Sequence, residues 1–122
     1  MAEREILWTV TDPRGLNITL TQDVWFAILA KHPDLVAFYD AVLATVQDPE
    51  AIYFDSDSTA KRATGAKFYL YYRGGMFAGQ LEGAYTAVVV KVVIEQDQDQ
   101  GYVQTSYPSE QILPRLVLEW KK

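Results

Sequence analysis

Apolar residues recur along the chain with two different periods, and the change between them separates a helical part from a strand part. Between residues 21 and 47 they recur every three to four positions, which is typical of amphipathic helices. Pro33 interrupts this stretch, because the residue before a proline, here His32, avoids the helical region of backbone space. The pattern therefore predicts two consecutive helices that meet at His32 and Pro33, with Thr21 as the first N-cap.

Segments in which apolar and polar residues alternate strictly flank the helical stretch on both sides. In residues 1–20 two alternating segments surround the turn-forming run TDPRG, which predicts an N-terminal strand or hairpin. Residues 51–120 predict strands joined by hairpins, and the most continuous apolar one, residues 85–95, should be central in the sheet. The last strand, residues 116–120, should lie at an edge.

The order of these elements predicts the fold class. Helices precede most of the strands without β-α-β alternation, which favours an α+β fold with an antiparallel sheet. We therefore predict two consecutive helices packed on a four-stranded or slightly larger antiparallel sheet, with a possible N-terminal hairpin. At 122 residues, without a long linker or repeat, the chain should be one domain over residues 1–122.

Composition narrows the class of protein. The chain is 49% hydrophobic and 22% charged, which is typical of a globular protein rather than a disordered one. It has no membrane-length apolar run, and its start is not that of a secretion signal. The absence of cysteine fits a reducing compartment, so we expect a cytoplasmic protein. One histidine and no cysteine argue against a conventional zinc site. We expect no metal site and no cofactor.

Charge is distributed unevenly. The net charge of -5 argues against binding of long nucleic acid by bulk electrostatics. Residues 61–91, however, carry five Lys and Arg residues against Glu82 alone. This basic segment is either an anion-binding face or a solvated surface whose cations pair with nearby acids. Alternation in residues 67–73 places four side chains on one face of a strand: Lys67, Tyr69, Tyr71 and Arg73. This face could hold a phosphate and stack a base. Alternatively, it is an ordinary exposed sheet face.

His32 is the only histidine in the protein. Acid–base chemistry near neutral pH would centre on it, on a carboxylate with a shifted pKa, or on a Lys or Tyr side chain. Its position at the helix junction also fits a structural histidine that caps the helix break. Asp55 and Asp57 resemble the first motif of haloacid-dehalogenase-type phosphotransferases, but the parallel sheet and later acidic pair of that family are missing. We interpret them as the start of a loop.

Several short motifs follow one another in a suggestive order, from a helix start through a His-Pro-acid element to a Val-x-Thr-Ser-Tyr strand. They are Leu20-Thr21, Trp25, Ile28, His32-Pro33-Asp34-Leu35, Tyr39, Val42, Pro49, Ile52, Tyr69 to Arg73, Val88 to Val92 and Val103 to Tyr107. This order resembles the phage- and mobile-element-associated nuclease-like domains of the barnase, EndoU, colicin and RelE-like superfamily. The likeness covers most of residues 16–110.

The resemblance implies RNA cleavage without a metal, as in a toxin or phage-related effector with a possible antitoxin or immunity protein as partner. His32 would be the general acid or base, Thr105 and Tyr107 would position the phosphate, and Arg73 or Lys91 would bind it.

Local charge adds three supporting RNA-binding candidates: Lys67, Arg62 and Tyr71. The chain is acidic, whereas free-standing ribonuclease toxins are usually basic. The alternative is therefore a catalytically inactive member of the same fold that acts as a protein-interaction module.

Overall fold

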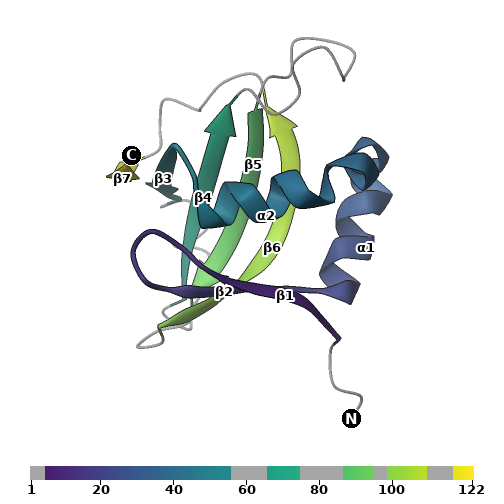
Figure 1. The fold of residues 1–122 in the computed structure, drawn as a ribbon, viewed down its shortest axis with the longest axis horizontal. Helices are drawn as coiled ribbons and strands as arrows, with labels where there is room; N and C mark the ends of the chain where they lie inside the picture. Colours follow the sequence, from purple (N-terminus) through teal and green to yellow (C-terminus); the bar gives the residue numbers. More distant parts are fainter. Residues whose placement is uncertain (1–4, 56–65, 75–86, 95–98, 110–116) are drawn as a thin grey trace.

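The computed structural model describes residues 5–55, 66–74, 87–94, 99–109 and 117–122. In this part of the chain, two α-helices and a 3-10 helix lie against one sheet (Figure 1). The helical segments are α1 (Gln22–Lys31), η1 (Pro33–Phe38) and α2 (Tyr39–Gln47). The strands are β1 (Ile6–Thr11), β2 (Asn17–Thr21), β3 (Ala51–Phe54), β4 (Lys67–Gly74), β5 (Ala87–Ile94), β6 (Gln100–Ser109) and β7 (Val117–Lys121).

The sheet has seven strands in the order β1-β2-β6-β5-β4-β3-β7, and it is mixed. β2 runs parallel to β6, with Asn17 opposite Gln100, whereas the other neighbours are antiparallel. The prediction of two helices on a four-stranded or slightly larger antiparallel sheet is therefore wrong, although the α+β description fits broadly. The reason is that the N-terminal hairpin joins the sheet through β2, a long-range pairing that local alternation does not encode. β5 is central and β7 is at an edge, as expected.

The helical stretch contains three segments rather than two. α1 begins after Thr21, as predicted, and buries Trp25 and Ile28. Pro33 then starts a 3-10 helix, which has three residues per turn rather than 3.6. This changes which side chains face the core, and Val36 is 64% exposed. None of the helices in the described residues has the length and apolar character to cross a membrane.

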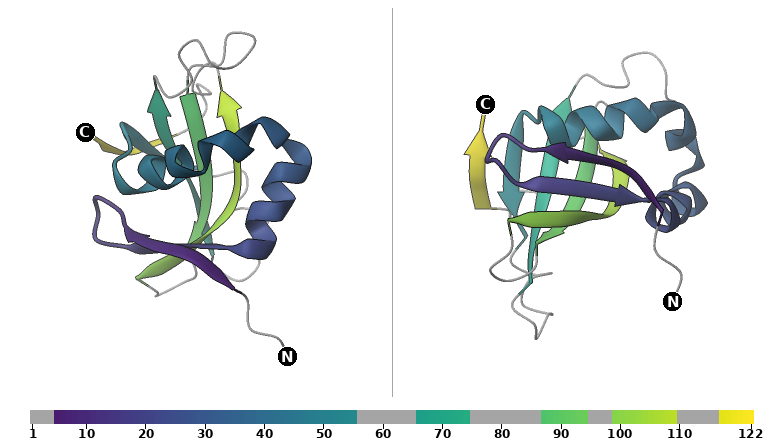
Figure 2. Two further views of the ribbon diagram at one scale, coloured as in Figure 1. Left: turned by 45° about the vertical axis from the view of Figure 1, so that its right-hand side comes forward. Right: turned by 60° about the horizontal axis from the view of Figure 1, so that its bottom comes forward.

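The core lies between α2, the β1–β2 hairpin and one face of the central strands. α2 and the hairpin lie side by side across this face, as Figures 1 and 2 show from three directions. We call the covered face the inner face and the opposite one the outer face. On the inner face, α2 contributes Val42 and Val46, and β5 contributes three fully buried valines, Val88, Val90 and Val92.

Candidate functional site

The strand register divides the predicted site residues between the two faces of the sheet. Tyr71 lies opposite Val90 and Arg73 opposite Val88, so both belong to the inner face with the core valines. Lys91 alternates with those valines and therefore belongs to the outer face. Thr105, which pairs with Lys91, and Tyr107, which pairs with Val89, share that outer face. The residues expected to act together thus form two separate groups.

Tyr71 belongs to a closed polar cluster inside the protein. It is fully buried, and its phenol donates a hydrogen bond to Asp12 Oδ2. Arg14 Nη2 donates to the same phenol oxygen at 3.1 Å, and its guanidinium lies 4.5 Å from the ring centroid of Tyr69. Burial raises the pKa of Tyr71 well above its ordinary value, and the hydrogen bond to Asp12 raises it further. The phenol stays protonated, and the base-stacking role considered for Tyr71 does not fit a side chain without exposed surface.

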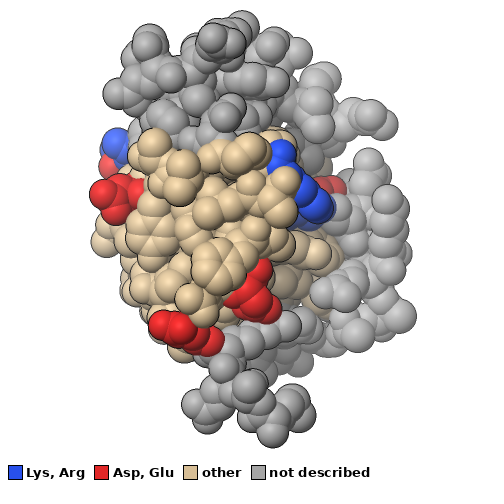
Figure 3. Space-filling view, turned by 90° about the vertical axis from the view of Figure 1, so that its right-hand side faces the viewer, with Lys and Arg blue, Asp and Glu red and all other residues tan. Residues whose placement is uncertain are grey.

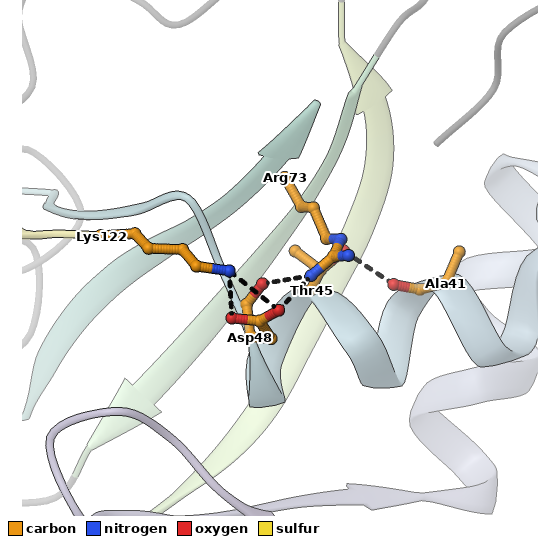
Figure 4. A network of polar contacts seen from close by, with 5 residues as sticks. All are labelled: Ala41, Thr45, Asp48, Arg73 and Lys122. Carbon is orange, nitrogen blue, oxygen red and sulfur yellow. Dashed lines mark hydrogen bonds and ion pairs between the residues drawn. The ribbon is translucent and has the colours of Figure 1, made fainter. Parts of the chain in front are cut away.

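Arg73 takes part in a second cluster, which joins α2, β4 and the end of the chain (Figure 4). Its Nη1 lies 2.8 Å from Asp48 Oδ2 and 2.6 Å from the Asp48 carbonyl oxygen. Lys122 Nζ reaches the same carboxylate at 3.0 Å. Hydrogen bonds from Lys122 and Arg73 lower the pKa of Asp48. The cluster neutralises a carboxylate at the helix C-terminus, where the helix dipole disfavours negative charge.

His32 and Tyr107 come together where the helix junction meets β6. Their ring centroids are 6.4 Å apart and the ring planes are inclined by 41°. α1 packs along β6 and brings His32, at its C-terminal end, to the strand (Figure 1). Both side chains keep partial exposure. Burial raises the pKa of Tyr107, and the charge of Asp55 raises it further, so the phenol is a proton donor at neutral pH.

Lys91 lies farther along the outer face and pairs with an acid. Its Nζ is 3.5 Å from Asp55 Oδ2 and 5.2 Å from the ring centroid of Phe68. The Asp55 N–H donates to the Phe68 carbonyl at 2.9 Å, which continues the β3–β4 pairing one residue beyond β3. Asp55 therefore alternates with Phe54 and projects to the outer face, as Lys91 does.

Two contacts, His32 with Tyr107 and Lys91 with Asp55, and the pairing of Thr105 with Lys91 define a set of five residues. We call this set the outer-face cluster: His32, Thr105, Tyr107, Lys91 and Asp55. Four of them were site candidates from the sequence, whereas Asp55 was interpreted as the start of a loop. The signal that could have identified it is its place at the end of an alternating strand, in phase with Tyr53, where an acid on a predominantly apolar face needs a partner.

The remaining sequence candidates lie elsewhere. Lys67 is exposed at the start of β4, opposite Ile94, and Arg62 lies outside the described residues. In the described ranges, His, Asp and Glu side chains form no group of three that could hold a metal ion.

No family model, curated protein or solved structure matches this chain. The functional argument therefore starts from the chemistry of the outer-face cluster.

Proposed function

We propose that the protein is a ribonuclease-like domain that cleaves RNA by metal-independent acid–base chemistry at the outer-face cluster. The observation that carries the proposal is the contact between His32 and Tyr107, on the sheet face that also holds Lys91. An imidazole, a phenol that stays protonated and an ammonium group are the three kinds of group that such a reaction needs.

The assigned roles follow from the chemistry of each group. His32 takes the proton of the RNA 2′-hydroxyl, and the 2′-oxygen forms a bond to phosphorus. The bond from phosphorus to the 5′-oxygen breaks, and that oxygen takes a proton from the Tyr107 phenol. Lys91 stabilises the negative charge on the phosphoryl oxygens, with a hydrogen bond from Thr105 beside it. The products are a 2′,3′-cyclic phosphate and a 5′-hydroxyl.

Cleavage of total RNA by the purified protein in EDTA tests this proposal. Wild type should cleave, and His32→Ala should lose about a hundredfold or more in rate, the usual contribution of a general acid or base. Lys31→Ala is the matched control because Lys31 is exposed and adjacent in the chain. It should keep wild-type activity. If wild type does not cleave, or if His32→Ala cleaves equally well, the proposal is wrong.

A second candidate function is a protein-interaction module, and the surface of the helical segments favours it. Phe26 on α1 is 59% exposed and Val36 on η1 is 64% exposed. The face that includes α1 is largely uncharged, with acidic and basic side chains near its margins (Figure 3). Large exposed apolar side chains are typical of surfaces that bind other proteins. Phe26→Ser and Val36→Ser would then abolish partner binding, whereas a ribonuclease would keep its rate in both variants.

A further inference from the structure

We infer that Asp55 occupies the anion-binding position of Lys91 and thereby sets how weakly or tightly the outer-face cluster holds a phosphate. The inference rests on the proposed function in one respect, which is that the competing anion is an RNA phosphate. It assigns Asp55 an affinity-determining role that does not require Asp55 to take part in proton transfer.

The geometry brings the two charges together across an intervening strand. Lys91 is on β5, Asp55 follows β3, and Phe68 on β4 lies between them in the sheet order. The Lys91 ammonium passes over the Phe68 ring, at 5.2 Å from its centroid, to reach a carboxylate oxygen at 3.5 Å. An aromatic face attracts a cation, so the ring favours this direction of the lysine side chain. The ammonium therefore already has a carboxylate where a phosphate oxygen would bind.

Partial burial makes this pair stronger than an ordinary surface ion pair. The side chains of Lys91 and Asp55 are 23% and 15% exposed, and screening by solvent and salt is weaker for such charges. By contrast, Asp48 and Lys122 are 52% and 62% exposed. The Asp55 carboxylate should consequently compete with an incoming anion more effectively than Asp48 would.

Tyr107 is the second group that would contact the phosphate. Burial raises the pKa of its phenol and the charge of Asp55 raises it further, so the electrostatic field of Asp55 acts at this position as well. A phosphate between Lys91 and Tyr107 would therefore lie within the field of the same carboxylate. Like charges repel, so the intact cluster disfavours the anion. Removing the charge of Asp55 takes a competing carboxylate away from the ammonium and relieves the repulsion at once.

The binding of a fluorescein-labelled, all-deoxy single-stranded oligonucleotide tests the inference. This probe carries phosphates but no 2′-hydroxyl, so it cannot be cleaved by the proposed chemistry. Asp55→Asn should bind it about tenfold more tightly than wild type, and inorganic phosphate should compete. Asp48→Asn, which makes the same change in net charge at the Arg73 and Lys122 cluster, should stay within about twofold of wild type. Adding Lys91→Met to Asp55→Asn should remove the gain.

Three results would overturn the inference: equal affinities of Asp55→Asn and Asp48→Asn, no gain at all, or a gain that persists without Lys91. Asp55→Ser is the second variant should Asp55→Asn not fold by circular dichroism, with the same expected gain. Cleavage assays separate this inference from the proposed function. A gain in binding without RNA cleavage by wild type rejects the ribonuclease and supports the anion site. RNA cleavage by wild type without a gain in binding supports the ribonuclease and rejects the anion site.

Discussion

The phenol of Tyr71 donates a hydrogen bond to the carboxylate of Asp12, although the two residues are 59 positions apart in the chain. Asp12 lies in the turn between β1 and β2, and Tyr71 lies on β4, which β6 and β5 separate from β2 in the sheet. The same carboxylate accepts hydrogen bonds from the backbone N–H groups of Arg14 and Leu16, each at 2.9 Å. One carboxylate thus shapes the turn and fastens it to the inner face of a distant strand.

Replacing Tyr71 with Phe should destabilise the protein by about 1–3 kcal/mol at neutral pH. The phenylalanine fills most of the same volume, but the Asp12 carboxylate, which is 4% exposed, loses a donor. Urea unfolding at pH 7 measures the change. Tyr102→Phe is the control, because Tyr102 is 40% exposed, and it should stay close to wild type. A Tyr71→Phe variant as stable as wild type would show that the hydrogen bond contributes nothing net to folding.

The raised pKa of Tyr71 predicts a loss of stability in alkaline solution. Its pKa is higher in the folded state than in the unfolded state, so its contribution is complete below about pH 10, the ordinary tyrosine value. As the pH rises above that value, the unfolded chain releases the proton first and folding becomes less favourable. Unfolding free energies from pH 8 to 11 should therefore fall more steeply for wild type than for Tyr71→Phe. Parallel curves would contradict this linkage.

The position of Tyr71 shows which features of the fold the sequence pattern does not predict. Alternation predicted correctly that Tyr69, Tyr71 and Arg73 share one face of a strand. It could not predict that this face is the one that carries the core valines of β5, because that depends on the register between strands. The parallel pairing of β2 with β6 was also beyond the sequence pattern, since it joins segments on either side of the helices.

Gly101 tests how closely β6 approaches β5. It lies on β6 between two neighbours, opposite Ile18 of β2 and Ile94 of β5. A Cβ atom at this position would be 2.9 Å from the Val93 carbonyl oxygen, which is backbone and cannot move aside cheaply. Gly101→Ala should therefore destabilise the protein by about 1–3 kcal/mol, as overpacking usually does.

Thermal unfolding provides the measurement, with Gln100→Ala as the control, since Gln100 is exposed and directly precedes Gly101. The control should unfold close to the wild-type temperature. Unchanged stability of Gly101→Ala would mean that β6 does not approach β5 so closely at this position.

Tyr107 should report directly on the charge of Asp55. Burial and the Asp55 carboxylate both raise the pKa of Tyr107, burial more strongly. Asp55→Asn should lower that pKa while leaving it above the ordinary value of about 10. NMR of ring-labelled tyrosine over an alkaline titration measures it, and Asp48→Asn should cause no change. An equal pKa in wild type and Asp55→Asn would place the carboxylate too far from the phenol to matter.

The sequence named four members of the outer-face cluster but not their arrangement in space. His32 was named as the only histidine and through the family resemblance, whereas Thr105, Tyr107 and Lys91 were assigned roles through the resemblance. Asp55 was interpreted as the start of a loop, because the sequence does not show the β3–β4 register or the reach of Lys91 over Phe68 that bring the two charges together. Arg73 was named through the family resemblance and the alternation of residues 67–73, but it pairs with Asp48 on the other face.

The most direct measurement uses a DNA oligonucleotide that contains a single ribonucleotide, incubated with the protein in EDTA. The proposed chemistry requires a 2′-hydroxyl as nucleophile, an imidazole at His32 and no metal ion. Wild type should cut once, on the 3′ side of the ribonucleotide, and leave a 2′,3′-cyclic phosphate, while His32→Ala should not cut measurably over the same time. Absence of the cut with wild type, a cut in the all-deoxy oligonucleotide, or an equal rate with His32→Ala would contradict the proposed function.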